Sequence, residues 1–447
     1  MKIPITLTMS VCIFITGCSK YLDKKPDKQL AIPSSLLELQ ELMDNNSVMN
    51  NNRAAAGEGS ADNYYLTDND FDNLYNESGR SLYLWGSNIT YDDFPNDWSH
   101  CYDAVYYANV VLENVDKLPV NDSAAYRNVK GSALFFRACS FLTALSNWTI
   151  GYNQSTANTD LGIPLRLSSD FNLVSVRSST KAGYEQVLSD LHGAAILLPV
   201  KTLQGMRPSS AAANAMLARC FLAMQLYDSS LYYAVKSLQV QNSLMDFNTL
   251  DSSSFAPVPR FNKEVFVQLG MVQSSNLYYG KVDSSLCNSY DNADLRRYIY
   301  FIFNSDGSYS FKGNYNNSGY YFVGPAVDEM YLTKAECEAR IGNVNTAMHD
   351  LNTLLSLRWR KGSFIPFTAT TQTNAISQIL SERRKELLYR DIRWMDLKRL
   401  NLSAATASTI YRSVHGTQDS LVPNDLKYAL PIPQAVIDIS DIPQNPR

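Results

Sequence analysis

Apolar residues recur at three- and four-residue steps from Trp98 onward, and this helical period limits the fold more than any other feature of the chain. The period predicts helices over residues 102–118, 124–148 and 180–198. Proline stands directly after the first and the third of these segments, where it would end a helix. A fourth helix is expected to begin in the alanine run 211–213, with Ser209 as its N-cap. The sequence therefore predicts a mostly α-helical protein.

Two segments have the spacing of tetratricopeptide units, in which small residues lie where the two helices of a pair touch. In the clearer segment, Ala335 and Ala347 stand twelve residues apart, with Gly342 at the turn between them. The other segment carries the matching residues Leu217, Ala218, Phe221, Tyr227, Ser230 and Ala234. Two such matches within a helical chain indicate stacked, tetratricopeptide-like helix pairs.

Two other stretches, residues 45–95 and 243–325, are rich in Asn, Ser, Asp, Gly and Tyr and lack a helical period. Short apolar runs at 265–269 and 298–303 are candidates for strands. Asp306-Gly307 stands between apolar runs and is typical of a tight hairpin turn. We therefore expect an irregular, loop-rich lobe that contains a few short strands and displays side chains for binding.

The first residues of the chain have the pattern of a secretory signal. Lys2 precedes an uncharged stretch over residues 3–16, which is shorter than the ~20 apolar residues that cross a bilayer. The tetrapeptide Ile15-Thr16-Gly17-Cys18 follows it and matches the bacterial lipobox. We expect a lipoprotein signal peptide over residues 1–17 and a lipid (palmitate among its acyl chains) on Cys18. Because no other uncharged run approaches 20 residues, the chain should be anchored to a membrane without spanning it.

Charge and cysteine content narrow the function classes. A net charge of −4 argues against nucleic acid as a partner, since that partner requires a basic face. The five cysteines that would remain after processing are Cys101, Cys139, Cys220, Cys287 and Cys337. They are odd in number and scattered, which is typical neither of a disulfide framework nor of a zinc site. Those in helical segments should act as small apolar fillers, and we expect no metal and no cofactor.

Several segments, in order, resemble the SusD/RagB family of outer-membrane nutrient-binding lipoproteins. The resemblance covers essentially the whole chain, and its most specific part is Glu382-Arg383-x-x-Glu386-Leu387, which continues to Arg393-Trp394-x-Asp396-Leu397-Lys398-Arg399. Other matching segments are Cys18–Asp23, Trp98–Tyr102, Phe136–Ala138, Leu161–Leu165, Leu430–Gln434 and Gln444–Pro446. The chain departs from the family at Arg390-Asp391, where relatives usually carry Glu-Gly, and this puts the local helix geometry in question.

The resemblance implies a SusD-like fold of tetratricopeptide-like helix pairs, with an N-terminal helical region over residues 18–242 and a C-terminal region over 243–447. It also implies a protein on the cell exterior that covers a SusC-like TonB-dependent β-barrel transporter in the outer membrane. Such proteins capture an oligosaccharide or an oligopeptide and hand it to the channel. They bind their ligand without cleaving it, so we expect no enzyme activity.

The charged segment 382–399 is interpreted as structural. Leu380, Leu387 and Trp394 are seven residues apart and would pack inward from one face of a helix. Glu386 and Arg390 are four residues apart, in the acid-before-base order that favours a surface ion pair. We therefore expect one amphipathic helix with a paired polar face and no catalytic residue.

Aromatic residues in the polar stretches are the candidates for ligand binding, because a flat ring can stack on the C–H face of a sugar while nearby amides satisfy the hydroxyls. The candidates are Trp85, Tyr278, Tyr279, Tyr309 and Tyr315. Trp98, in contrast, precedes the first long helix and is expected in the core. Single exposed aromatics are also common without any function, so these residues are chosen by type and location.

Three alternatives to a glycan-binding lipoprotein stay open. The ligand could be an oligopeptide on the same fold. The protein could be a surface glycoside hydrolase, because that chemistry needs only two carboxylates and no sequence motif. It could also be a helical scaffold with no small ligand, in which case the irregular lobe would carry no cluster of exposed aromatic rings.

Overall fold

The long helices begin at side chains that cap their first turn. The computed structural model describes residues 33–86, 94–317 and 319–447. Helix α7 (Ser123–Trp148) begins after Asp122, whose carboxylate accepts hydrogen bonds from the N–H groups of Ala124 and Ala125. Helix α8 (Thr180–Leu197) begins after Ser179, and α9 (Ser210–Ala223) begins after Ser209, which accepts from the Ala212 N–H. The predicted cap at Ser209 is thus confirmed.

Helix α6 (Asp97–Asn114) begins earlier than its apolar period indicates. The Asn96 side chain accepts from the Ser99 N–H at 3.1 Å, and the Ser99 hydroxyl lies 2.9 Å from the Asn96 N–H. This reciprocal capping box fixes the first turn five residues before the predicted start. A short 3-10 turn, η2 (Val115–Lys117), completes the predicted segment up to Leu118.

The tetratricopeptide-like pairs are confirmed. Helix α9 packs against α10 (Tyr227–Val240), where the Ser230 hydroxyl donates to the Ala218 carbonyl at 2.9 Å. Helix α14 (Val327–Arg340) packs against α15 (Val344–Leu355), with both Ala335 and Ala347 completely buried between the helices. Gly342 adopts a φ of +95° at the turn, a conformation that favours glycine.

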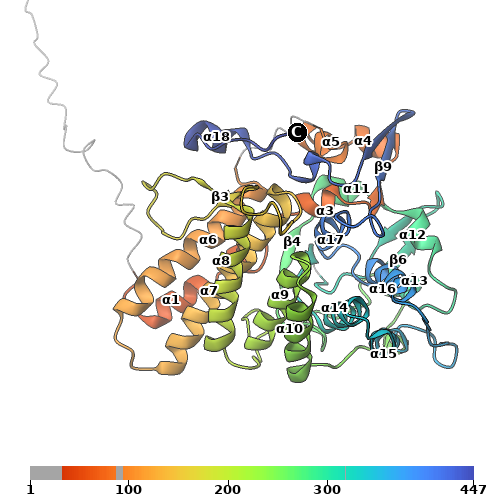
Figure 1. Ribbon diagram of the computed structural model, residues 1–447, viewed down its shortest axis with the longest axis horizontal. Coiled ribbons are helices and arrows are strands. Elements are labelled where there is room, and N and C mark those ends of the chain that lie inside the picture. Colours follow the sequence, from red (N-terminus) through yellow and green to blue (C-terminus); the bar gives the residue numbers. More distant parts are fainter. Residues whose placement is uncertain (1–32, 87–93, 318) are drawn as a thin grey trace, which may run out of the picture. The chain divides into compact units, whose positions relative to one another are not determined.

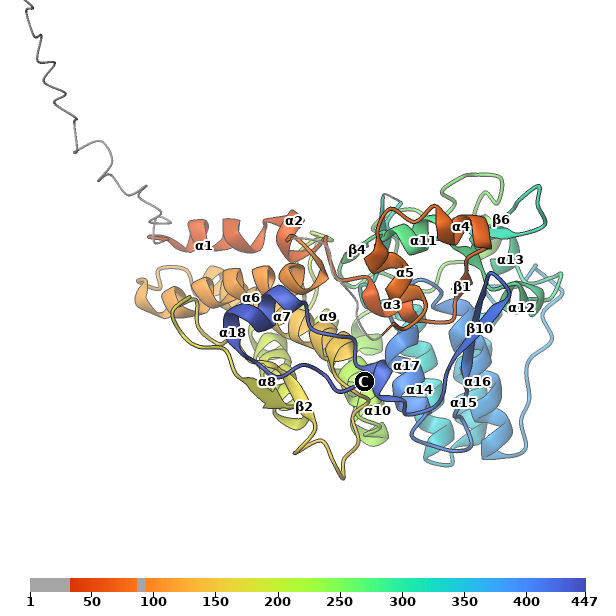
Figure 2. The ribbon, with the colours of Figure 1, turned by 90° about the horizontal axis from the view of Figure 1, so that it is seen from above.

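The helices form one continuous array (Figures 1 and 2). Each helix packs on the next in the series α6, α7, α8, α9, α10 and α14, and α14 packs on both α15 and α16 (Gln372–Glu386). The contact between α10 and α14 carries the array across residue 242, the boundary expected from the sequence. Residues 35–447 accordingly form one compact unit.

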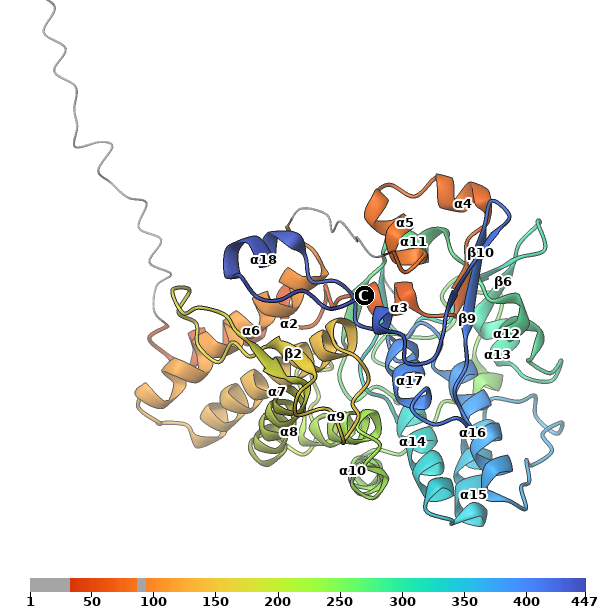
Figure 3. The ribbon, with the colours of Figure 1, turned by 45° about the horizontal axis from the view of Figure 1, so that its top comes forward.

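The polar stretches form the irregular lobe, made of short helices and two-stranded sheets (Figure 3). The short helices of this lobe are α3 (Ala56–Ser60), α4 (Asp68–Asp72), α5 (Glu77–Tyr83), α11 (Ser275–Tyr279), α12 (Ser284–Asn288) and α13 (Arg296–Tyr300), with η3 (Phe247–Thr249). Two further short helices pack on the helix array: α1 (Leu36–Met43) on α6 and α7, and α2 (Asn46–Met49) on α6. Helix α18 (Gln434–Ser440) and η4 (Leu426–Tyr428) lie near the C-terminus. Apart from α1, these short helices have at most seven residues.

Every sheet of the described residues is an antiparallel pair. The pairs are β1 (Tyr64–Tyr65) with β5 (Lys281–Val282), β2 (Leu161–Pro164) with β3 (Arg177–Ser179), β4 (Gly270–Val272) with β8 (Tyr320–Phe322), β6 (Phe301–Phe303) with β7 (Tyr309–Phe311), and β9 (Ile410–Val414) with β10 (Thr417–Leu421). The predicted turn at Asp306-Gly307 joins β6 to β7, and Gly307 has a φ of +83°. Of the two apolar runs, 298–303 is strand only in its second half, and 265–269 leads directly into β4.

The single amphipathic helix expected over 382–399 is not formed. Helix α16 ends at Glu386, and α17 (Arg393–Leu400) begins after an irregular break. Tyr389 and Asp391 adopt φ values of +56° and +54° in this break. Glycine adopts the left-handed conformation of Asp391 at no steric cost, which agrees with the glycine that the resemblance implies at this position. The departure noted in the sequence is therefore a non-glycine residue at a position that glycine would suit.

The charges of this segment are buried, which overturns the expected surface pair. Glu386 accepts from Arg358 at 2.7 Å and from Arg296 at 3.0 Å, while Arg390 pairs with Asp328 at 3.2 Å. Within the described residues, Glu386 and Arg390 form no ion pair with each other. The polar residues of the motif thus connect α16 and α17 to other parts of the protein. The segment is structural, as expected, but through buried ion pairs and not through a solvated helix face.

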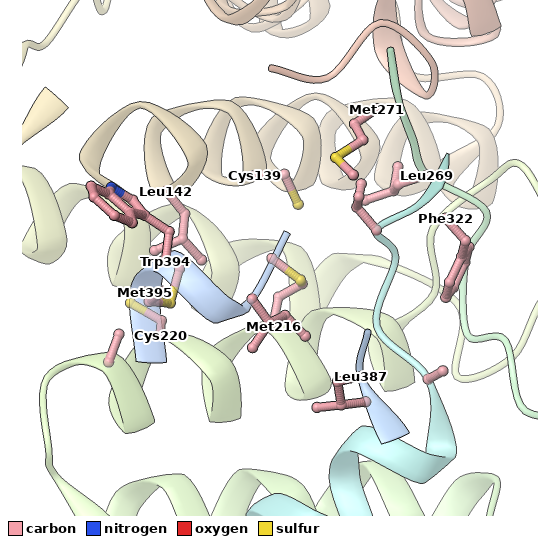
Figure 4. Close-up of a cluster of buried hydrophobic side chains, with 14 of the residues drawn as sticks. Cys139, Leu142, Met216, Cys220, Leu269, Met271, Phe322, Leu387, Trp394 and Met395 are labelled. Carbon is pink, nitrogen blue, oxygen red and sulfur yellow. The ribbon is translucent and has the colours of Figure 1, made fainter. Parts of the chain in front are cut away.

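The apolar core joins the helix array to the irregular lobe. Figure 4 shows one buried cluster in which Leu142 of α7 and Trp394 of α17 lie at one side, Met271 of β4 and Phe322 of β8 at the other, and Met216 of α9 between them. The cysteines at 101, 139, 220, 287 and 337 are all buried and free, as expected for apolar fillers. Trp98 is 5% exposed and packs between Tyr102 and Trp148, which confirms its place in the core.

The predicted signal peptide and Cys18 lie outside the described residues. Within the part of the chain that the structure describes, none of the helices combines the length and the apolar character needed to cross a bilayer.

Candidate functional site

The two polar stretches meet beside the N-terminus of α6, where α5 packs against α11 (Figure 3). The Asn276 side-chain amide donates to the Gly79 carbonyl at 2.8 Å. A Cβ atom on residue 79 would lie only 2.8 Å from Asn276 Oδ1, so a larger residue there would displace the Asn276 amide from this hydrogen bond. Residues distant in sequence are thereby fixed next to one another.

A cavity of about 350 Å³ lies at this junction. Its polar lining includes Asn76, Asp97, His100, Gln273, Ser274 and Asn276, and Tyr75 stands at its edge. The size and the mixture of amide, hydroxyl, carboxyl and imidazole groups suit a small number of hydroxyl-bearing ligand units.

Three tyrosines form a row that adjoins this cavity through Tyr75, and we call Tyr75, Tyr279 and Tyr278 the tyrosine row. The Tyr75 and Tyr279 ring centroids are 5.7 Å apart, and those of Tyr279 and Tyr278 are 5.1 Å apart, both in edge-to-face geometry. Tyr75 is 74% exposed and Tyr278 62% exposed. A hydrogen bond with the Tyr75 hydroxyl raises the pKa of Tyr279, so the hydroxyl groups as well as the rings are held together. The row offers flat apolar surface to solvent.

Some polar side chains around the cavity form hydrogen bonds within the protein, and others do not. The Asp97 carboxylate accepts from the N–H groups of Ala55 and Ala56, at 3.0 and 2.7 Å, and so fixes the segment that leads into α3. Gln273 donates to the Tyr321 hydroxyl at 3.1 Å. His100 Nδ1 and Ser274 Oγ are buried and have no hydrogen-bond partner among the described residues. Both atoms are closed to solvent in this conformation, so a ligand in the cavity contacts them only after a side chain rotates.

Two of the predicted ligand-binding residues do not present a ring to solvent. Trp85 is 1% exposed; its indole N–H donates to the Ser60 carbonyl at 3.0 Å, and the Arg412 guanidinium lies 4.9 Å from its ring centroid. Tyr315 is 2% exposed, and its hydroxyl donates to Glu264 at 2.9 Å. Burial against charged partners from distant parts of the chain makes both residues part of the core.

The other predicted residues lie in two places. Tyr278 and Tyr279 belong to the tyrosine row. Tyr309 lies on β7 in a separate cavity of about 760 Å³, with its ring 5.4 Å from that of Phe303. The structure therefore brings together two of the five predicted residues and places a third at another site.

Another cavity, of about 790 Å³, runs along α6 toward α18. It is lined largely by apolar and aromatic groups such as Tyr106, Phe171 and Ile439. The side-chain amide of Asn109 in this cavity donates hydrogen bonds to the carbonyl groups of Arg166 and Ser168, at 2.9 and 3.2 Å. The lining of this cavity is thus proportionally more apolar than that of the cavity beside the tyrosine row.

Sequence reasoning missed Tyr75, Asp97 and His100. Tyr75 stands between Leu74 and Asn76 in a polar stretch and meets the criterion that selected Tyr278, so composition could have identified it. Asp97 and His100 lie in the first turn of a helix, and their approach to α11 is visible only in three dimensions. No group of three or more His, Cys, Asp or Glu side chains in the described ranges is placed to hold a metal ion.

The sequence matches two family models. Residues 20–222 match the model described as starch-binding and associating with outer membrane, and residues 327–447 match the model of the SusD family. No curated protein sequence matches this chain.

Solved structures share the fold over almost the whole chain. A SusD superfamily protein from Bacteroides thetaiotaomicron has a TM-score of 0.74 at 20% identity, covering 92% of this chain and 100% of that one. A SusD superfamily protein from Bacteroides fragilis has a TM-score of 0.73 at 19% identity, covering 92% and 99%. A SusD-like carbohydrate binding protein from Bacteroides vulgatus has a TM-score of 0.67 at 18% identity, covering 91% and 97%. The matched sequence models and this shared fold together show that the chain belongs to the SusD/RagB family.

Proposed function

We propose that this protein is a cell-surface lipoprotein that binds an oligosaccharide at the tyrosine row and delivers it to a SusC-like TonB-dependent transporter. The description of the family model that matches the N-terminal half, starch-binding and associating with outer membrane, supports both the ligand class and the location. The lipobox at Ile15–Cys18 supports anchoring through a lipid on Cys18. The observation that carries the proposal is the placement of exposed tyrosine rings beside amide and hydroxyl groups.

The geometry fits a sugar for a physical reason. A pyranose ring has an apolar C–H face, which gains free energy when it covers an exposed aromatic ring. Its hydroxyl groups lose water at the same time and need hydrogen-bond partners, because a polar group buried without one is costly. Tyr75 and Tyr278 supply the ring surface, and the amide and hydroxyl side chains of the adjoining cavity supply hydrogen-bond partners.

The same lining supports binding without cleavage as part of the proposal. Glycoside hydrolysis uses a pair of carboxyl groups that flank the scissile bond. Among the cavity-lining residues that the structure describes, Asp97 has the one carboxyl group, and two backbone N–H groups already occupy it. This lining supports the proposal that the site holds a glycan without hydrolysing it.

A panel of soluble polysaccharides and oligosaccharides tests the binding role, with the mature chain carrying a purification tag in place of the lipid. The double variant Tyr75→Ala/Tyr278→Ala should bind the responding glycan at least about tenfold more weakly, because stacked rings contribute roughly 1–2 kcal/mol. Tyr411→Ala is the matched control, since Tyr411 is 60% exposed on β9 and belongs neither to the tyrosine row nor to the lining of its cavity. Equal binding by both variants, or response to peptides and to no glycan, would contradict the proposal.

The anchor and the transporter have a separate test. Cys18→Ser should move the protein from the outer-membrane fraction to a soluble fraction, because a chain without acyl groups has no hydrophobic membrane anchor. Affinity purification of the wild-type protein from detergent-solubilised outer membranes should recover a TonB-dependent β-barrel. Recovery of no barrel protein would contradict the delivery role while leaving glycan binding intact.

A further inference from the structure

The cavity around Tyr309 has features of a second ligand site. It lies between the β6–β7 hairpin and the loop 252–255, and its volume is about 760 Å³. Its side walls include Phe255, Arg297, Tyr298, Phe303, Tyr309 and Lys312. The lining thus combines aromatic rings with two cations, and it contains no carboxylate among the described residues.

The aromatic rings of this cavity are unusually open. Phe255 is 81% exposed, Phe303 is 69% exposed and Tyr298 is 39% exposed. Single exposed apolar residues are normal on a protein surface, but several large ones around one hollow mark an interaction site. Phe303 is also fixed in direction, because Tyr309 meets its ring edge to face. The rings therefore form a preformed surface and not a set of unrelated side chains.

The two cations lack the partner that the arginines of the core possess. The buried Arg296, Arg358 and Arg399 each pair with carboxylates. In contrast, Lys312 donates to the carbonyl groups of Ser252 and Ser254, at 2.6 and 3.2 Å, and Arg297 donates to the Tyr290 carbonyl at 3.4 Å. Neither Arg297 nor Lys312 forms an ion pair within the described ranges.

Asp251 is the acidic group that acts on Lys312 through space, yet it does not neutralise the cavity. Its carboxylate accepts from the hydroxyl and the N–H of Ser253, at 2.6 and 2.9 Å. Partial burial lowers the pKa of Lys312, and the charge of Asp251 offsets only part of this effect. A ligand that carries negative charge would supply a counterion.

We propose that this cavity is a second binding site that takes an acidic saccharide. Sugar rings stack on Phe303, Tyr309 and Tyr298, and a carboxylate or sulfate ester on the sugar binds Arg297 and Lys312. The choice of a saccharide rests on the function proposed above, whereas the charge preference rests on this cavity alone. The site is separate from the tyrosine row, whose adjoining cavity has a carboxylate in its lining and the imidazole of His100 in place of a lysine or arginine.

The test compares oligogalacturonate with the same oligomer after full methyl esterification, which removes the charge and keeps the rings. Wild-type protein should bind the acidic form at least about tenfold more tightly, and the preference should decline as salt is raised, because exposed charges are screened. Arg297→Gln should remove most of this preference. Lys201→Met is the matched control, since Lys201 is exposed outside the cavity, and it should leave the preference unchanged.

Three further results separate the second site from the first. Phe303→Ala should weaken both forms of the oligomer, because it removes ring surface. The Tyr75→Ala/Tyr278→Ala variant should keep the preference for the acidic form, and its loss there would move the acidic site to the tyrosine row and overturn the inference. Equal binding of polyglutamate of the same length would overturn the assignment to a saccharide. If no glycan binds at the tyrosine row but the acidic preference follows Arg297, the proposed first site fails and the second stands.

Discussion

The backbone N–H of Asp391 donates a hydrogen bond to the Glu58 carboxylate at 3.0 Å, and it links the break between α16 and α17 to helix α3. Glu58 is completely buried, and its other oxygen accepts from Asn63 at 2.7 Å. Asp391 Oδ1 is also buried and has no hydrogen-bond partner among the described residues. Two acidic side chains thus meet in a region that disfavours their charged forms.

This relationship predicts a pH-dependent stability. Burial raises the pKa of Glu58 from its ordinary value of 4.5 to about 7, with the hydrogen bond from Asn63 opposing the shift. Between these two pH values, Glu58 holds a proton in the folded state that it has released in the unfolded chain. The contribution of Glu58 to the free energy of unfolding therefore falls as pH rises from 4.5 to 7, and it is constant above that. Relative to Glu58→Gln, which has no proton to lose, wild-type protein should lose roughly 2–3 kcal/mol between about pH 5 and about pH 8. Urea unfolding at both pH values measures this, and a difference that does not change with pH would contradict it.

Asp391 itself gives a second prediction. Burial, followed by the charge of Glu58, raises the pKa of Asp391 far above its usual range, and the residue also holds a left-handed φ of +54°. Asp391→Gly should therefore be more stable than Asp391→Ala by about 1 kcal/mol, because both remove the carboxyl group and only glycine relieves the backbone. Thermal unfolding of the two variants tests this comparison. A more stable alanine variant would show that the left-handed conformation is not kept.

Arg358 is the centre of the buried ionic network. Its guanidinium contacts Glu264 at 2.9 Å and Glu386 at 2.7 Å, and all three side chains are completely inaccessible to solvent. Arg358→Met should cost about 3–5 kcal/mol, because it leaves two carboxylates buried with less compensation. Lys181→Met is the control: its pair with Glu185, at 3.6 Å, is exposed and should contribute well under about 1 kcal/mol. Denaturant unfolding should separate the two variants clearly, and similar costs would argue against a central role for Arg358.

The small residues between paired helices supply a fourth prediction. Ala347 is completely buried where α15 meets α14, so Ala347→Leu should destabilise the protein by about 1–3 kcal/mol through overpacking. The neighbouring Thr346 is exposed, and Thr346→Leu should change the stability by no more than about 0.5 kcal/mol. Thermal melts of both variants, with circular dichroism to show retained helix content, make the comparison. An unaffected Ala347→Leu would mean that the helices can separate at little cost.

The sequence could identify some of the aromatic residues at the proposed sites, but not all of them. Tyr278, Tyr279 and Tyr309 could be selected by their type and their polar surroundings, and all three lie at or beside cavities. The same criterion selected Trp85 and Tyr315, which are buried because Arg412 and Glu264, from distant parts of the chain, contact them. Local composition does not contain such contacts. The contact between Tyr75 and Tyr279 could not be predicted either, because it forms only where two stretches distant in sequence meet.

Along the helices, the sequence by itself determined the fold. The helical period, the N-cap at Ser209 and the small residues Ala335 and Ala347 each depend on neighbours within one or two helical turns. They could therefore be predicted from the local sequence, and the structure confirms them. Only the tertiary structure decided which way the charges of 382–399 face, because the same spacing serves a solvated surface or a buried network. It also decided which aromatics stay exposed, since burial depends on what the rest of the chain brings against each ring.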